Sequence, residues 1–176
     1  MKKMLVAVDW SEHSERAVEL ASDLASKYGA ELIAVHVISD EALPSEERHL
    51  AEIELADEIK KYPGSGLKAN SLGGTSLEMK EVFTEHRVRD RTLRSILGEM
   101  LLKRAKRAAQ GKGVKTIETA LAEGNVAENI LRAAKENKAD MIVLGSRGMG
   151  TLGEMLLGSV SHKVNQLSDI SVVTVK

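Results

Sequence analysis

Three glycines and a serine near the end of the chain have the types and the spacing of a phosphate-binding turn. The glycines are Gly145, Gly148 and Gly158, in the segment GSRGMGTLGEMLLGS, and Ser159 follows directly. The apolar residues 141–144 come just before, so the segment begins where a buried strand is expected to end. Glycines can adopt positive φ and let backbone N–H groups approach an anion, and the start of the next helix adds unpaired donors. We therefore expect a phosphate site here.

The spacing of these glycines differs from that of two well-known nucleotide-binding motifs. Neither the P-loop pattern GxxxxGK[ST] nor a GxGxxG opening a first βαβ unit fits the chain. Glycines near a strand end also serve tight packing, and a lone pair would more often do only that. Three glycines at this spacing, with a hydroxyl residue behind them, favour the phosphate site over the packing explanation.

Composition limits the classes of protein to which the chain can belong. One domain of ordinary size is expected from 176 residues, and a hydrophobic content of 43% is enough to form a core. The 25 basic and 26 acidic residues are balanced, and aromatic residues make up only 2%, so neither nucleic acid nor membrane is an expected partner. The absence of cysteine excludes disulfides and thiolate catalysis within the chain. The start, MKKMLVAVDW, is too short for a signal peptide, so we expect a cytoplasmic protein.

Hydrophobic periodicity predicts strands that alternate with helices. The expected strands are residues 4–8, 32–38, 114–122, 141–144 and 170–175, and the expected helices of the same pattern are residues 14–28, 126–137 and 159–166. Ser14 is the expected cap of the first helix, and Gly29 is expected to end it. Between the second and third strands, two charged helical patterns over residues 45–61 and 76–110 flank a loop rich in glycine.

Strands that alternate with helices imply an α/β fold, with an open parallel five-stranded sheet, helices on both faces and a Rossmann-like character. Ligands bind such sheets at the carboxyl ends of the strands, where the strand order reverses. Asp9 follows the first strand, and Gly145 follows the fourth. We therefore expect these two residues to converge on one cleft, although Asp9 could equally serve only as a helix cap.

The motifs resemble those of the universal stress protein family, in its ATP-binding, UspA-like subgroup. The family pattern is glycine, two residues, glycine, nine residues, then glycine with serine or threonine, and this chain matches it in full. The segments VDWSEHSERA, LIAVHVI and EGNVAENIL also resemble the family. The resemblance covers about residues 1–40 and 112–176. It implies one domain over residues 1–176 with an adenine nucleotide alpha-hydrolase-like fold, and a helical insertion at about 40–111 that departs from the family.

The resemblance further implies that an adenine nucleotide, ATP or else AMP or ADP, lies in the cleft, with Mg²⁺ or Mn²⁺ bridging its phosphates. Asp9 and Ala7 would lie near the nucleoside, and Val37 would meet adenine through its backbone. Arg147 is either a phosphate contact or a solvated charge. The residues assigned to the nucleotide are Ala7, Asp9, Val37, Gly145, Ser146, Arg147, Gly148, Met149, Gly158, Ser159, Val160 and Ser161. No residue is assigned as a metal ligand.

The sequence gives little support for an enzyme. Phosphoryl transfer needs a positioned cation, metal ligands and a group that orients the nucleophile, but the motif offers one arginine and hydroxyls, with no lysine closer than Lys163. No catalytic residue is therefore expected. A regulatory or stress-response module that changes its conformation or assembly with nucleotide is favoured. A slow ATPase that needs a partner, and a structural interaction protein with an unused pocket, stay as alternatives.

Two surfaces are expected to bind other chains. The strand over residues 170–175 is strongly β-prone, and family members commonly dimerise through it, so we expect a homodimer. The helical insertion is the expected surface for a protein partner that the sequence does not identify. His36 stands in an apolar strand and is expected to be a hydrogen-bonded core histidine rather than a catalyst.

Overall fold

The computed structural model describes residues 2–39, 76–148 and 157–176, with side chains from residue 90 onward in the middle range. The chain divides into two compact units, Met1–Asp40 with Gly98–Lys176, and Glu41–Leu97. In the second unit the described residues form part of helix α4 (Ser76–Gly111), as predicted for this stretch. The helix and loop expected before it lie outside the described residues. The insertion within a single domain stays a prediction.

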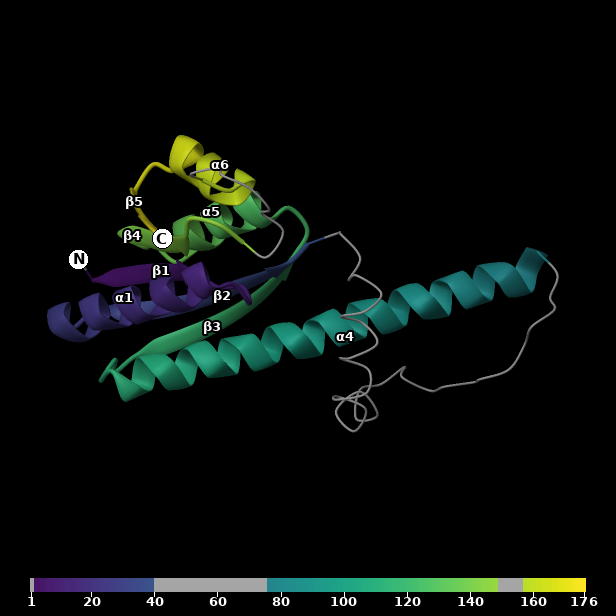
Figure 1. The fold of residues 1–176 in the computed structure, drawn as a ribbon, viewed down its shortest axis with the longest axis horizontal. Coiled ribbons are helices and arrows are strands. Elements are labelled where there is room, and N and C mark those ends of the chain that lie inside the picture. The colour runs from purple at the N-terminus through teal and green to yellow at the C-terminus, as the bar shows by residue number, and fades with distance from the viewer. Residues whose placement is uncertain (1, 40–75, 149–156) are drawn as a thin grey trace. The chain divides into compact units, whose positions relative to one another are not determined.

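The first unit contains one sheet of five parallel strands in the order β3-β2-β1-β4-β5 (Figure 1). The strands are β1 (Lys3–Ala7), β2 (Glu31–Ile38), β3 (Ile117–Glu123), β4 (Met141–Gly145) and β5 (Ser171–Val175). The chain steps from β1 through β2 to β3 on one side, then returns to β4 and β5 on the other. The strand order therefore reverses between β1 and β4, and sheets of this kind bind ligands beside the carboxyl ends of the strands at such a reversal.

Helices cover both faces of this sheet, which confirms the expected fold class. The remaining helices are α1 (Glu12–Tyr28), α5 (Val126–Glu136) and α6 (Ser159–Leu167). Side chains alternate between the faces, because strand residues point to opposite sides in turn. Met4 and Val6 pack with α1 and with the part of α4 that follows Gly98. Leu5 packs on the other face with residues of α5 and α6. Figure 1 shows these two helices on the opposite side of the sheet from α1.

The start of α1 differs from the prediction. The cap is Ser11 rather than Ser14, since the Ser11 side chain accepts the backbone N–H of Ser14 and the helix begins at Glu12. The Ser14 hydroxyl is buried and accepts the backbone N–H of Asp9 at 2.9 Å instead. The end of α1 is as predicted, because Gly29 adopts φ 63° and closes the helix.

The start of β3 also differs, by three residues from the expected Val114. The backbone N–H of Val114 donates to Ala109 in the last turn of α4 at 3.1 Å, so this valine belongs to the helix end. The first sheet pair of β3 joins Ile117 to Leu32. Val114 has a high strand propensity, yet its backbone N–H is bound by the end of a helix. Strand propensity alone does not predict this outcome.

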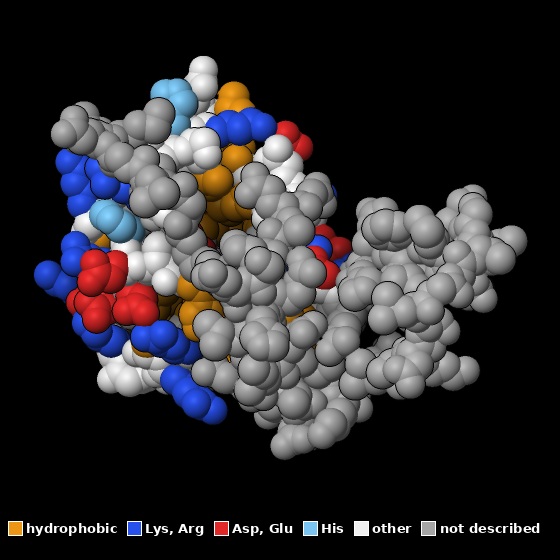
Figure 2. All heavy atoms as spheres, turned by 45° about the vertical axis from the view of Figure 1, so that its right-hand side comes forward, with side chains coloured by type: hydrophobic (Ala, Val, Ile, Leu, Met, Phe, Trp, Pro, Cys, Tyr) orange, Lys and Arg blue, Asp and Glu red, His pale blue; other side chains and the backbone are white. Residues whose placement is uncertain are grey.

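On the face shown in Figure 2, basic and acidic side chains lie interspersed over the described residues, with hydrophobic side chains visible between them. Two ion pairs join α4 to α1, from Arg104 to Glu15 at 2.7 Å and from Lys112 to Asp23 at 2.9 Å. None of the helices that the structure describes is long and apolar enough to cross a membrane.

Candidate functional site

The turn after β1 and the segment after β4 meet at the strand-order reversal. Asp9 accepts the backbone N–H of Ser11 at 2.9 Å and its hydroxyl at 2.5 Å, both through Oδ1. The Ser11 hydroxyl also lies 3.2 Å from the carbonyl oxygen of Arg147. The other carboxylate oxygen of Asp9 faces Gly148, where an added Cβ would stand only 2.9 Å from it. The expected convergence of the first and fourth strands is therefore present.

A second contact between the same two segments lies deeper. The Nδ1 atom of His13 is 3.0 Å from the hydroxyl of Ser146, which is 1% exposed. Gly145 lies against the same turn, because a Cβ there would come within 2.9 Å of the His13 backbone and of the Ser14 nitrogen. Since real Cβ atoms do not approach so closely, position 145 requires glycine for packing alone.

The start of α6 is bound to the same glycine segment. The backbone N–H of Gly158 donates to the carbonyl oxygen of Ser146 at 2.7 Å. The buried Ser161 hydroxyl reaches the same oxygen at 2.8 Å and the carbonyl oxygen of Gly158 at 2.9 Å. Gly158 is the N-cap of α6 and provides no side-chain cap hydrogen bond. The cap residue therefore accepts none of the backbone N–H groups in the first turn of α6 through a side chain.

The three described glycines of the motif, Gly145, Gly148 and Gly158, do not adopt positive φ. Among the described glycines, positive φ occurs at Gly29, Gly113 and Gly124. At Gly145 the backbone of the first turn of α1 leaves no room for a Cβ, whereas a Cβ at Gly148 would meet only the end of the Asp9 side chain. The glycine pattern thus serves to bring two chain segments together rather than to provide left-handed backbone.

The nucleoside end expected from the sequence lies along the carboxyl ends of β1 and β2. Ala7 is the last residue of β1, and Val37 is buried near the end of β2. The expectation for His36 is met in its hydrogen bond, since its Nδ1 lies 2.8 Å from the carbonyl oxygen of Val8. Because a carbonyl oxygen can only accept, this nitrogen carries the proton.

Ten of the twelve residues assigned from the resemblance lie on segments that come together at this edge. They are Asp9 and Ala7 with Gly145, Ser146, Arg147, Gly148, Gly158, Ser159, Val160 and Ser161. Val37 lies farther along the same edge, on β2. Met149 lies outside the described residues. Ser159 is exposed, whereas the hydroxyls of Ser146 and Ser161 are bound within the protein.

Sequence reasoning missed Ser11 and His13, which join the two segments. The signal for Ser11 was present in the segment DWSEHS, since an aspartate two residues before a serine can form an Asx turn with it. The same serine three residues before Ser14 also has the spacing of a helix cap. The contact of His13 with Ser146 had no such signal, because 133 residues separate the two.

Among the described residues, no group of three or more His, Asp or Glu side chains could hold a metal ion. This edge offers hydroxyls, backbone N–H groups, one arginine and the carboxylate of Asp9. Such a set can bind an anion and hydrogen-bond a neutral polar group beside it.

A comparison with known families matches residues 1–176 to the universal stress protein family. The chain belongs to the universal stress protein family. The universal stress protein YxiE of Bacillus subtilis is 35% identical to it over 182 residues, covering 99% of this chain and 98% of YxiE. The resemblance stated from the motifs is thereby confirmed.

Solved universal stress proteins share the fold. UspA from Lactobacillus plantarum has a TM-score of 0.62 at 19% identity and covers 99% of this chain and 97% of its own. A universal stress protein solved in complex with cAMP gives a TM-score of 0.59 at 22% identity, covering 99% and 95%. One from Archaeoglobus fulgidus, in complex with dAMP, gives 0.56 at 19% identity, covering 100% and 98%.

Proposed function

We propose that this universal stress protein binds an adenine nucleotide, ATP or else ADP or AMP, at the carboxyl edge between β1 and β4. The observation that carries the proposal is the contact of Asp9 with Gly148, which joins the turn after the first strand to the glycine segment. Neither segment alone makes a site. Together they place a carboxylate beside an anion-binding turn, which suits a ligand with a polar nucleoside at one end and phosphate at the other.

At the phosphate end of the proposed site, some residues would contact the ligand and others would hold the glycine segment in place. Ser159 is exposed at the start of α6 and, with the first N–H groups of that helix, is free of the packing role that holds its neighbours. The hydroxyls of Ser146 and Ser161 are hydrogen-bonded within the protein and hold the glycine segment in shape, so they would affect the phosphate only through the position of that segment. Arg147 adds a cation that phosphate oxygens can reach.

Two related structures support an adenine nucleotide as the ligand class. The proteins solved with cAMP and with dAMP carry ligands that share an adenine base and a phosphate. We infer the same class here, because this chain has the fold of those proteins and the glycine pattern at the corresponding edge. A Mg²⁺ or Mn²⁺ ion would bind through the phosphates of the nucleotide, since such ions commonly need few protein ligands there.

The protein acts, in this proposal, as a regulatory module of the stress response that changes its conformation or assembly when nucleotide binds. Pairing of two copies through β5 is part of it, because β5 ends the order of the described strands and four of its five residues are only partly buried. A measurement of ATP turnover with and without Mg²⁺ separates this binding role from a slow ATPase.

The first test is a thermal melt with ATP, ADP, AMP and no nucleotide. Wild type at about a hundred times the dissociation constant should gain about 2.7 kcal/mol of apparent stability. Gly148→Ala places a Cβ 2.9 Å from Asp9, so the carboxylate and the glycine segment must move apart. A tenfold weaker affinity would reduce the gain to about 1.4 kcal/mol. Trp10, the one tryptophan, is 39% exposed next to Asp9 and gives an independent fluorescence signal.

Gly111→Ala is the matched control, since a Cβ there meets no atom within 4 Å. It should gain as much from nucleotide as wild type. A wild type that gains nothing from any of the three nucleotides would refute the proposal. A Gly148→Ala protein that gains as much as wild type would refute the assignment of the glycine segment while leaving nucleotide binding intact.

A further inference from the structure

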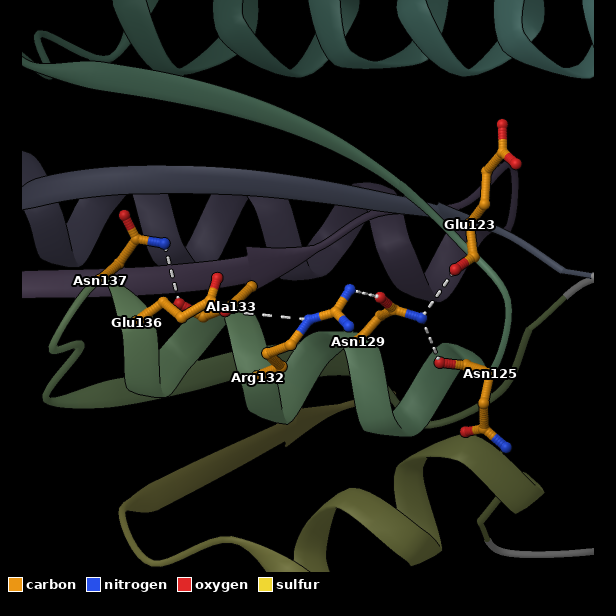
Figure 3. A network of polar contacts seen from close by, with 7 residues as sticks. All are labelled: Glu123, Asn125, Asn129, Arg132, Ala133, Glu136 and Asn137. Atoms are coloured by element: carbon orange, nitrogen blue, oxygen red, sulfur yellow. Dashed lines mark hydrogen bonds and ion pairs between the residues drawn. The ribbon is translucent and has the colours of Figure 1, made fainter.

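Asn129 of α5 is a buried polar side chain, 6% exposed, to which the sequence analysis assigned no role. Its amide nitrogen donates to the carbonyl oxygens of Glu123 at 3.0 Å and of Asn125 at 2.8 Å. Its amide oxygen accepts from the guanidinium of Arg132. Figure 3 shows the side chain between the arginine and the turn that joins β3 to α5. The two bonds from the amide nitrogen therefore act on one short turn, and the bond from Arg132 holds the amide from within α5.

The chemistry of the partners fixes the orientation of this amide. The two carbonyl oxygens only accept, so the nitrogen must face them, and the guanidinium only donates, so the oxygen must face Arg132. Gly124 lies in this turn and adopts φ 106°, a conformation that glycine accepts and other residues rarely adopt. Asn129 holds the carbonyls on both sides of this glycine.

The turn lies at the carboxyl edge of the sheet, beside the nucleoside end of the proposed site. The backbone N–H of Gly124 donates to the carbonyl oxygen of Ile38 at 2.9 Å, at the end of β2. Val37, the preceding residue, pairs in register with β3. Lys163 of α6 pairs with Glu128 of α5 at 3.0 Å, so the start of α5 and the first half of α6 lie along the same edge.

We propose that Asn129 is a positioning residue for the nucleoside half of the site, because it holds the β3–α5 turn as a wall of the space beside Val37. This inference rests on the proposed function. Asn129 does not touch the ligand in this account. It acts through the turn, whose backbone it fixes by two hydrogen bonds from a single buried amide.

Asn137 provides a matched control at the other end of the same helix. Its amide nitrogen also donates to a backbone carbonyl oxygen, that of Ala133, at 2.8 Å. It is the C-cap of α5, close before β4 begins, and so belongs to the amino edge of the sheet. Loss of either amide should lower the stability of the protein, but only loss of the Asn129 amide should weaken the affinity for a ligand at the carboxyl edge.

The test compares the affinities of Asn129→Ala, Asn137→Ala and wild type for adenosine and for ATP by isothermal titration calorimetry. We expect Asn129→Ala to weaken both ligands by the same factor, about tenfold, because they share the nucleoside. Asn137→Ala should bind both as wild type does. Equal affinity of Asn129→Ala and wild type for adenosine would overturn the inference, and so would a loss confined to ATP.

Arg132→Ala is a second variant for the case that Asn129→Ala does not fold. Arg132 is exposed, and its removal leaves the Asn129 amide free to turn away from Glu123 and Asn125. Adenosine should then bind about threefold more weakly. Glu136→Ala removes the other partner of Arg132, 4.0 Å away on the surface, and should leave adenosine binding unchanged. Wild-type adenosine affinity in Arg132→Ala would contradict the inference.

Wild type is titrated first, so that two failures stay distinct. If wild type binds neither adenosine nor ATP, the proposed function fails and this inference falls with it. If wild type binds both and the Asn129 and Arg132 variants bind adenosine equally well, nucleotide binding stands and only the role of Asn129 is refuted.

Discussion

Gly158 differs from the other two glycines of its motif, because the fold does not need it. A Cβ at this position would lie 3.4 Å from the carbonyl oxygen of Ser146 and 3.8 Å from the Ser161 hydroxyl, which are ordinary contacts. Its backbone, at φ −72° and ψ 163°, is that of a usual N-cap residue. A glycine that packing does not require fits the proposal that a phosphate approaches the start of α6 closely.

Gly158→Ser should therefore separate stability from binding. Serine is at least as good an N-cap as glycine, so the free protein should be as stable as wild type or up to about 1 kcal/mol more stable. The new hydroxyl would accept an N–H of the first turn that the phosphate would otherwise use, and ATP should bind about tenfold more weakly. Urea denaturation and calorimetric titration measure the two effects.

Gly145→Ala is the contrasting variant at the other end of the motif. Its Cβ would come within 2.9 Å of His13, so we expect a loss of about 1–3 kcal/mol of stability whether or not nucleotide is present.

A Gly158→Ser protein that binds ATP as tightly as wild type would mean that phosphate does not use the start of α6.

Two neighbouring strands, β1 and β4, are joined at their amino ends by one carboxylate. Asp140 accepts the backbone N–H groups of Lys2 at 2.5 Å and of Lys3 at 3.0 Å. The backbone N–H of Asp140 donates in return to the carbonyl oxygen of Lys3 at 2.8 Å. The hydrogen bonds from Lys2 and Lys3 lower the pKa of the Asp140 carboxyl below its ordinary value of 3.8.

This shift predicts how the contribution of Asp140 depends on pH. The folded-state pKa is lower than the unfolded value, so the stabilisation is complete above about pH 4 and is lost as pH falls through the folded pKa. Asp140→Ala should have a lower urea midpoint than wild type at pH 7, and the difference should shrink below pH 4. Asp169→Ala, an exposed aspartate before β5, is the comparison variant. A difference that stays constant down to pH 3 would contradict this origin of the stabilisation.

Assembly of the proposed dimer depends on the strand at the end of the sheet. Val173 is partly buried in β5, which pairs with β4 alone among the described strands. Val173→Lys places a charge on this edge, which disfavours pairing with a second copy. Wild type should sediment as a dimer and Val173→Lys as a monomer, and Val173→Lys should also melt at a lower temperature because Val173 packs against the core on the α1 face of the sheet. A monomeric wild type at micromolar concentration would refute the dimer.

One backbone contact joins the strand of the proposed dimer to the segment of the proposed nucleotide site. The backbone N–H of Ser146 donates to the carbonyl oxygen of Val175 at 2.6 Å, so a hydrogen bond attaches the glycine segment to the end of β5. If β5 pairs as proposed, the dimer interface holds the strand that supports this segment. Val173→Lys should therefore also be titrated with ATP.

The parallel sheet was predictable because its signals are local. Apolar runs such as residues 141–144 and helical spacing such as that of α5 follow directly from which side chains must leave water. The glycine pattern likewise identified the segment that meets Asp9. The predicted cap at Ser14 and the predicted strand start at Val114 were wrong, because each residue has two competing partners and packing selects between them.

Spacing along the chain was sufficient to predict the described strands and helices, apart from some of their ends, as well as the family and the segments that meet at the candidate site, since each depends on neighbours a few residues apart. The contacts that shape the site depend on the fold. His13 meets Ser146, Asp9 faces Gly148, and Asn129 holds a turn beside β2, only because the strand order reverses between β1 and β4 and the sheet brings its carboxyl ends to one edge. The local sequence does not predict these contacts, because the residues that form them become neighbours only after the chain has folded.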